Sequence, residues 1–270
     1  MYLKDIKLLL ENKIAPKDFR LTPEGYGIQY GTIEEQKEIK RIMVTLDLSI
    51  EAIHFAITNK IKLIISRYGL VNNPISHFND IMIKKLTLLT KYPVLIFALN
   101  SPFIAVEGGI SDIIMNSLYL QLDRPFNILS QTGEEIPIGR ICLPQAYPDQ
   151  KDSLNLRTLV ERIRTFLNTN RIPYLGDLDK VLKRICIVPI DSLSIAYLER
   201  VQKEGCDCLI TGKVNCSEAL FARDIGLFII EISLFQCEII ALKKLCNLLS
   251  LEFPHEEFMM FDSIDPFSYV

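Results

Sequence analysis

The chain has 270 residues, which is enough for one large domain or two lobes around a sizeable buried core. Hydrophobic residues make up 49% and charged residues 23% of the sequence, and this balance excludes a largely disordered chain. The net charge is -3 and the isoelectric point is about 5.7, so direct nucleic-acid binding is not expected. No apolar run approaches the roughly 20 residues that cross a bilayer, so a membrane association is not expected either.

The N-terminal segment MYLKDIKLLLENKIAP is typical of an amphipathic helix, because lysines and acidic residues interrupt the apolar stretch that a signal peptide would need. The seven cysteines are an odd number without a framework spacing, which favours reduced thiols in a cytoplasmic protein. A zinc site built from Cys206, Cys208 and Cys216 is the alternative, but no nearby histidine supplies a fourth ligand. Free thiols that act as small buried hydrophobes fit the pattern better.

In chain order, a helix over residues 3–12 ends before Pro16, and a loop punctuated by glycines follows it. The first half then alternates between buried strands and amphipathic helices, and Ser49 is placed to cap the first of these helices. The expected strands cover 41–47, 61–66 and 94–99, and the expected helices cover 50–57, 81–90 and 110–118.

Residues 121–150 are rich in proline and turn residues, which indicates a connection between lobes that carries a hairpin. The alternation then resumes, and the residues after the last helix form a tail that is rich in aromatic and turn-forming residues. The expected strands cover 184–188, 208–210 and 227–232, and the expected helices cover 154–167, 193–204, 217–224 and 237–249. The sequence therefore predicts an α/β fold of two interlocked lobes, residues 1–125 and 126–270, with mixed sheets flanked by helices.

Side chains suited to catalysis are few. The three histidines, His54, His77 and His255, stand apart from one another and from any thiol, so each is read as a solvated or partly packed side chain. The sequence contains no P-loop, no nucleophile elbow of the type G-x-S-x-G and no G-x-G-x-x-G motif after a strand.

The ends of the predicted strands are more informative, because ligands of open α/β sheets collect at the carboxyl ends of the strands. Scattered carboxylates, hydroxyls and cations occupy these ends, without any imidazole. The positions are Asp47, Ser66-Arg67-Tyr68, Asn100-Ser101, Thr211-Gly212-Lys213 and the segment from Glu231 to Glu238.

These landmarks, taken in order, resemble the Nif-three-like family, the Ngg-interacting-factor proteins, whose bacterial members are named type-two GTP cyclohydrolase homologues. The similar segments run nearly from end to end. They are 27–31 (GIQYG), 41–47 (RIMVTLD), 63–70 (LIISRYGL), 108–112 (GGISD), 139–140 (GR), 183–187 (KRICI), 205–212 (GCDCLITG) and 265–267 (DPF).

The resemblance implies a site for two divalent metal ions between the lobes, and this chain departs from its ligands almost everywhere. The paired histidines of the family fall on Arg67 and Tyr68, its next histidine on Asn100, and its aspartate on Ile104. Its C-terminal His-x-x-x-Glu falls on Leu234 and Glu238, so only the glutamate remains, and a further polar position falls on Ser217. One carboxylate and one amide do not hold two divalent ions against water, so no cofactor is expected.

The first hypothesis is therefore a non-catalytic relative, a pseudoenzyme with a degenerate dinuclear metal site that acts as an oligomeric scaffold or regulatory binding protein. The resemblance implies a homo-oligomer, a homohexamer ring, and a protein partner in transcriptional regulation, in the cytoplasm or also in the nucleus. Three alternatives stay open beside it. An anion or nucleotide sensor would use Arg67 and Lys213 in place of the metal ions.

A metal-dependent hydrolase of the GTP cyclohydrolase type would need a relocated, carboxylate-only site. The residues available for it are Asp47, Asp112, Glu231 and Glu238. The third alternative is purely structural, with Arg67 and Glu238 forming a buried ion pair in an abandoned site.

Overall fold

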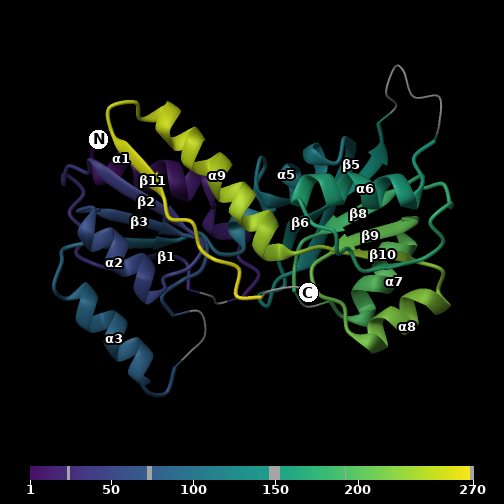
Figure 1. The fold of residues 1–270 in the computed structure, drawn as a ribbon, viewed down its shortest axis with the longest axis horizontal. Coiled ribbons are helices and arrows are strands. Elements are labelled where there is room, and N and C mark those ends of the chain that lie inside the picture. The colour runs from purple at the N-terminus through teal and green to yellow at the C-terminus, as the bar shows by residue number, and fades with distance from the viewer. Residues whose placement is uncertain (23–24, 72–74, 146–152, 192, 268–270) are drawn as a thin grey trace. The chain divides into compact units, whose positions relative to one another are not determined.

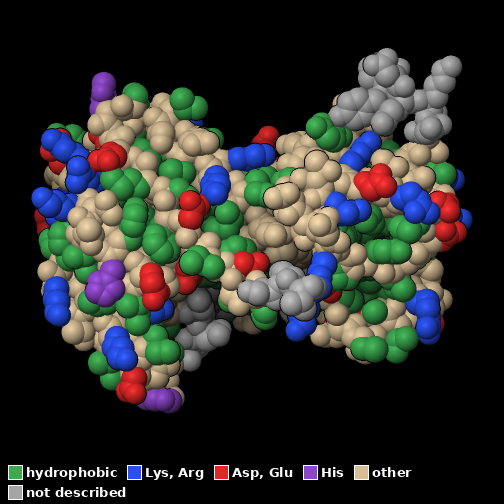
Figure 2. All heavy atoms as spheres, viewed as in Figure 1, with side chains coloured by type: hydrophobic (Ala, Val, Ile, Leu, Met, Phe, Trp, Pro, Cys, Tyr) green, Lys and Arg blue, Asp and Glu red, His purple; other side chains and the backbone are tan. Residues whose placement is uncertain are grey.

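The computed structural model describes residues 1–22, 25–71, 75–145, 153–191 and 193–267. These residues form two mixed β-sheets flanked by helices, which confirms the predicted α/β class (Figure 1). Basic and acidic side chains are interspersed over the face drawn in Figure 2, in keeping with the small net charge. Among the helices of the described residues, none combines the length and the apolar character that a membrane crossing requires.

The chain divides into two compact units, and each is described by itself. The first unit consists of residues 1–106, 130–133 and 238–270, and the second of residues 107–129 and 134–237. This partition differs from the predicted division at residue 125, because the C-terminal segment returns to the first unit and adds a strand to its sheet.

The sheet of the first unit has the strand order β1-β4-β3-β2-β11. β2, β3, β4 and β11 run parallel to one another along this order, and β1 is antiparallel to β4. The carboxyl ends of the parallel strands therefore meet at one edge of this sheet. The strands are β1 (Gly27–Tyr30), β2 (Arg41–Thr45), β3 (Leu63–Ser66), β4 (Leu95–Ala98) and β11 (Glu257–Met260).

Helices flank this sheet, with α2 and α3 on one side (Figure 1). Apolar residues of these helices pack with Met43, Ile64 and Ile96 from the strands in one buried cluster, which fixes the sheet against them. Ser49 caps α2 as predicted, and its Oγ accepts the N–H of Ala52 at 3.1 Å. The helices are α1 (Leu3–Leu9), which continues as a π-helical turn (Leu10–Ile14), a 3₁₀ turn (Lys17–Phe19), α2 (Ile50–Thr58), α3 (Asp80–Leu89) and α4 (Pro102–Ala105).

The sheet of the second unit has the order β5-β6-β8-β9-β10-β7. β8, β9 and β10 are parallel, and the other neighbours are antiparallel. Helices α5 and α6 lie on one side of this sheet and α7 and α8 on the other (Figure 1). The strands are β5 (Leu120–Leu129), β6 (Glu135–Pro144), β7 (Tyr174–Leu175), β8 (Ile185–Val188), β9 (Cys208–Thr211) and β10 (Phe228–Glu231).

The helices of this unit are α5 (Ile110–Ser117), α6 (Leu156–Leu167), α7 (Ile195–Lys203) and α8 (Cys216–Asp224). The last helix, α9 (Leu234–Glu252), begins in the second unit, and its residues from Glu238 onward belong to the first.

Two sequence predictions need correction. Phe258 belongs to β11 and not to a turn-forming tail, because residues 257–260 pair with 41–44 of β2. The glycine-punctuated loop contains a strand, β1, because residues 27–30 pair with β4. The hairpin predicted in the middle of the chain is present as β5 and β6, while residues 146–150 of that prediction lie outside the described residues.

Candidate functional site

The central contact of the candidate site is an ion pair between Arg67 and Glu238 in the first unit. Arg67 directly follows β3, and its N–H donates to the carbonyl of Thr45 at 2.9 Å, so the ladder between β2 and β3 extends to this residue. Its Nε lies 2.9 Å from Oε1 of Glu238, with side chains that are only 4% and 5% exposed. Nε has no well-aligned hydrogen bond among the described residues, so the contact is chiefly electrostatic. The sequence predicted this pair as one of its alternatives.

Tyr68 and Asn100 surround the pair. The hydroxyl of Tyr68 donates to Oε1 of Glu238 at 3.1 Å, and the guanidinium of Arg67 lies over the Tyr68 ring, 4.7 Å from its centroid. Nη1 of Arg67 is 3.5 Å from Oδ1 of Asn100, whose Nδ2 donates to the carbonyl of Gly25 at 2.7 Å. Asn100 has a φ of 48°, a left-handed conformation that asparagine tolerates better than most residues. Four positions singled out by the sequence thus form one connected cluster.

The other positions that the sequence singled out, three that correspond to family ligands and one from the anion pocket, are apolar or exposed to solvent. Ile104 lies buried in α4. Leu234 opens α9 in the second unit, where it packs so closely on Gly212 that a Cβ there would be 2.7 Å from Cδ1 of Leu234. In the same unit, Lys213 and Ser217 are exposed.

The carboxylates considered for a relocated site each have their own partner. In the first unit, Asp47 accepts the hydroxyl of Ser263 at 3.1 Å. In the second unit, Glu231 accepts the N–H of Val214 at 3.1 Å. Asp112 is buried there and forms an ion pair with Arg140, and it also accepts the N–H of Gly108 at 2.7 Å. These contacts supply structural roles for the carboxylates.

The described histidines and cysteines do not gather into ligand sets. His54, His77 and His255 are all exposed. The seven cysteines are free, and of the three proposed for zinc, Cys206 and Cys208 are buried while Cys216 is exposed at the start of α8. Within the described parts of the chain, no group of three or more His, Cys, Asp or Glu side chains is arranged to hold a metal ion.

Arg67, Tyr68, Asn100 and Glu238, together the strand-end cluster, do not fit the two divalent ions that the family resemblance implies. Arg67 brings a permanent positive charge to the carboxylate that a metal would need. Ile104 contributes no donor atom, and the phenol of Tyr68 and the amide of Asn100 are already engaged with their neighbours. What this arrangement can do is hold a buried, internally neutral pair of charges.

A positioning residue that the sequence did not reveal is Gln29 of β1. Its Oε1 accepts the N–H of Leu70 at 2.6 Å, directly after the turn that carries Arg67 and Tyr68. A Cβ on Gly25 would lie 2.2 Å from the carbonyl oxygen of Val71 and 2.2 Å from the Gln29 amide, so only glycine fits there. A Cβ on Gly69 would lie 2.6 Å from the Gln29 amide, which would have to move away from Leu70. The segments are distant in sequence, and no spacing rule relates a glutamine to a turn 40 residues later.

The fold and the site define an α/β protein with two mixed sheets. At the strand ends of its first sheet lies a polar cluster that contains a buried ion pair. The chain belongs to the family described as Duf34/NIF3 (NGG1p interacting factor 3), whose model matches residues 1–266. This match confirms the family predicted from the sequence.

Similar proteins extend over the whole length. A protein of Clostridium perfringens named "GTP cyclohydrolase 1 type 2 homolog" is 24% identical over 278 aligned residues that cover all of both chains. A protein of Methanocaldococcus jannaschii with the same name is 22% identical and covers 93% of this chain and 95% of its own.

Solved structures show the same fold. "The Crystal Structure of Bacillus cereus protein related to NIF3" has a TM-score of 0.80 at 15% identity and covers 99% of both chains. "Reduced HcgD from Methanocaldococcus jannaschii" has a TM-score of 0.78 at 22% identity and covers 97% of this chain and 98% of that one.

Proposed function

We propose that this chain is a non-catalytic member of the Duf34/NIF3 family that acts as an oligomeric scaffold or a regulatory binding protein. The observation that carries the proposal is the buried ion pair of Arg67 and Glu238, with 2.9 Å between Nε and Oε1. An arginine stays protonated at any physiological pH, so it competes permanently with a divalent cation for this carboxylate. The pair and its neighbours supply the charge neutrality that metal ions and their ligands would otherwise supply.

Hydrolysis by a metal-bound water requires a metal with an open coordination position and a set of anionic or imidazole ligands. The cluster offers one carboxylate, and that carboxylate already has a cation and a phenolic hydroxyl as partners. For this reason the activity in the name of the curated relatives is not proposed for this chain.

The scaffold role includes self-association, since the resemblance implies a homohexamer ring. Light scattering on the purified chain tests this part separately. A hexamer would support the scaffold role, and a monomer across the micromolar range would rule that role out. The proposed absence of catalysis is tested separately by the metal content.

Elemental analysis of the purified, chelator-free protein is the main test. We expect Zn, Fe, Mn and Ni each to be far below one per chain, whereas about two ions per chain, the complement of a dinuclear site, would overturn the proposal. The Clostridium perfringens relative, purified in parallel, is the reference. A gain-of-metal variant sharpens the test by restoring the family pattern, and it should bind metal where the wild type does not. Its substitutions are Arg67→His, Tyr68→His, Asn100→His, Ile104→Asp and Leu234→His.

An anion sensor is the second candidate, and one observation favours it: Nε of buried Arg67 lacks an aligned hydrogen bond in the described structure. Against it, Glu238 already neutralises this guanidinium. A thermal-shift series with phosphate and GTP decides between the two. Stabilisation that is lost in Arg67→Ala but kept in Arg41→Ala, a substitution of a half-exposed arginine of the same unit, supports the sensor. No shift with either anion removes it.

A further inference from the structure

A pocket of about 280 Å³ lies in the first unit, at the edge of the sheet opposite the strand-end cluster. It adjoins the amino end of β4 and the carboxyl end of β1, which meet because these two strands are antiparallel. The strand-end cluster, by contrast, includes residues that follow the carboxyl ends of β3 and β4. The polar side chains that line the pocket come from Tyr30, Thr32, Lys37, Thr90, Lys91 and Tyr92.

The loop between β1 and β2 forms one part of the pocket, and backbone hydrogen bonds hold Lys37 in place there. The carbonyl of Lys37 accepts the N–H of Leu3 at the start of α1 at 2.9 Å, and its own N–H donates to the carbonyl of Glu34 at 2.9 Å. Gly31 of the same loop has a φ of 97°, and a Cβ there would lie 2.5 Å from the carbonyl oxygen of Val94. A glycine at this position therefore lets the loop lie against the start of β4.

The turn after α3 supplies the second lysine of the pocket. The N–H groups of Lys91 and Tyr92 donate to the carbonyls of the last two residues of α3 at 3.1 Å and 3.2 Å, so this turn is tied to the helix. A third cation lies close by, because Nζ of Lys62 is 4.4 Å from the centroid of the Tyr92 ring. Both lysines of the lining are thus carried by backbone that hydrogen bonds fix.

The lining has positive charge without a compensating carboxylate. Within the described residues, the lysines that form ion pairs are Lys7, Lys40 and Lys243, so Lys37 and Lys91 are not among them. No aspartate or glutamate belongs to the lining that the structure describes. A pocket that carries cations and lacks acidic side chains attracts an anion.

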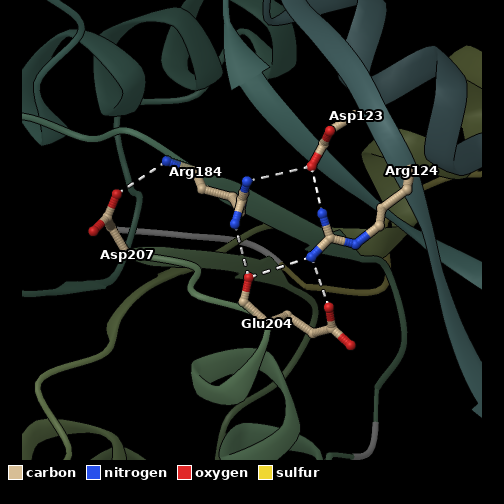
Figure 3. Close-up of polar contacts among 5 residues, drawn as sticks. All are labelled: Asp123, Arg124, Arg184, Glu204 and Asp207. Carbon is tan, nitrogen blue, oxygen red and sulfur yellow. Dashed lines mark hydrogen bonds and ion pairs between the residues drawn. The ribbon is translucent and has the colours of Figure 1, made fainter.

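The arginines of the second unit show the opposite arrangement (Figure 3). Nη1 of Arg124 lies 2.6 Å from the carboxylate of Asp123, and its Nη2 lies 2.7 Å from that of Glu204. Nη2 of Arg184 is 3.6 Å from the same carboxylate of Asp123. These cations are neutralised inside the protein, whereas the lysines of the pocket keep their charge available for an external anion.

Hydroxyl groups add hydrogen-bond donors to the lining. The hydroxyls of Tyr30 and Thr32 have no hydrogen-bond partner in the part of the chain that the structure describes. The hydroxyl of Tyr92 is buried and likewise has no partner among the described residues. A buried hydroxyl without a partner costs free energy, and an acceptor bound beside Tyr92 would remove this cost.

We propose that this pocket binds a phosphate group carried by a small organic molecule. A phosphate monoester has a charge of about -1.5 to -2 at pH 7 and oxygen atoms that accept hydrogen bonds, so two lysines and unpaired hydroxyls match both its charge and its hydrogen bonding. Lysine binds phosphate as a point charge and needs no planar, bidentate geometry. The volume is near the lower end of the range of small-molecule pockets, about 300–1,000 Å³, and this favours a single small metabolite.

Isothermal titration calorimetry of the full chain with ribose 5-phosphate, inorganic phosphate and ribose tests the proposal. We expect ribose 5-phosphate to bind at a single site per chain, inorganic phosphate to bind more weakly and ribose not to bind. Equal affinities for ribose 5-phosphate and inorganic phosphate would overturn the part of the proposal that concerns the organic group. No binding of either phosphate compound would overturn the site itself.

A pair of double variants locates the binding site. Lys37→Gln with Lys91→Gln should bind ribose 5-phosphate at least about tenfold more weakly than the wild type, because hydrogen bonds to charged groups are strong enough for such a change. Lys84→Gln with Lys85→Gln is the matched control, since it removes the same charge from α3 at positions outside the pocket lining. We expect this control to bind like the wild type, and equal losses in both double variants would contradict the proposal. The inference is independent of the proposed function, and its variants leave Arg67 unchanged.

Discussion

The ion pair of Arg67 and Glu238 permits a quantitative test of how deeply the strand-end cluster is buried. Arg67→Ala removes one partner and leaves the Glu238 carboxylate with 5% exposure and without its cation. Loss of one partner from a buried pair lowers the free energy of unfolding by about 3–5 kcal/mol. The same unit contains a matched pair at the surface, Arg41 and Glu257, with 2.8 Å between Nε and Oε2 and side chains 44% and 51% exposed. For Arg41→Ala we expect a loss of about 0–1 kcal/mol.

The expected difference between the two variants comes from burial, because the residue types and distances are nearly the same. The chain has no tryptophan, so urea unfolding is best followed by circular dichroism. Hydrogen exchange of β3 and β4 then assigns the loss to the first unit. A third variant, Arg67→Met with Glu238→Leu, replaces both charges by apolar groups and should be within about 1 kcal/mol of the wild type. The reasoning is refuted if Arg67→Ala costs no more than Arg41→Ala, or if the double variant is as unstable as the single one.

Three further predictions follow from described contacts. Tyr68→Phe removes the hydroxyl that donates to Glu238, and we expect a loss of about 1.5–3 kcal/mol in the same urea assay; a change below about 0.5 kcal/mol would mean that water replaces this bond. Arg140→Ala leaves Asp112 buried without its cation, so we expect the free energy of unfolding to fall by about 3–5 kcal/mol. Hydrogen exchange should become faster in α5 and β6, and an increase spread evenly over both units would contradict this prediction. In the folded protein the pKa of Tyr26 is raised to about 12, chiefly by burial. The folded state then holds this proton more tightly than the unfolded state, so stability is lost as the pH rises from about 10 to about 12, and Tyr26→Phe should lose less stability than the wild type over this range.

The local pattern of the sequence was enough to predict most strands and helices. An apolar run that ends in a carboxylate and is followed by a capping serine indicates β2 and α2 directly, because burial and capping act between near neighbours. β11 could not be predicted in this way. Its four residues are partly exposed, and they form a strand only because they pair with β2, more than 200 residues earlier.

The candidate site likewise combines contacts that the sequence predicted with contacts that only the assembled sheet reveals. The resemblance to a family placed Arg67 and Glu238 at corresponding positions, and opposite charges at such positions predict an ion pair. The support from Gln29 depends on two glycines that leave room for its amide, which becomes visible only when the strands are assembled.

The edge strand β11 also has a consequence for the order in which the protein is completed during synthesis. The whole of the second unit lies between residues 107 and 237, so it emerges from the ribosome in full before β11 does. The first unit starts earlier but lacks the partner of β2 until residues 257–260 emerge. Domains usually finish folding from the N-terminus onward as they are synthesised. In this chain the unit that begins first is completed last, and until then the hydrogen-bonding edge of β2 stays open to other strands.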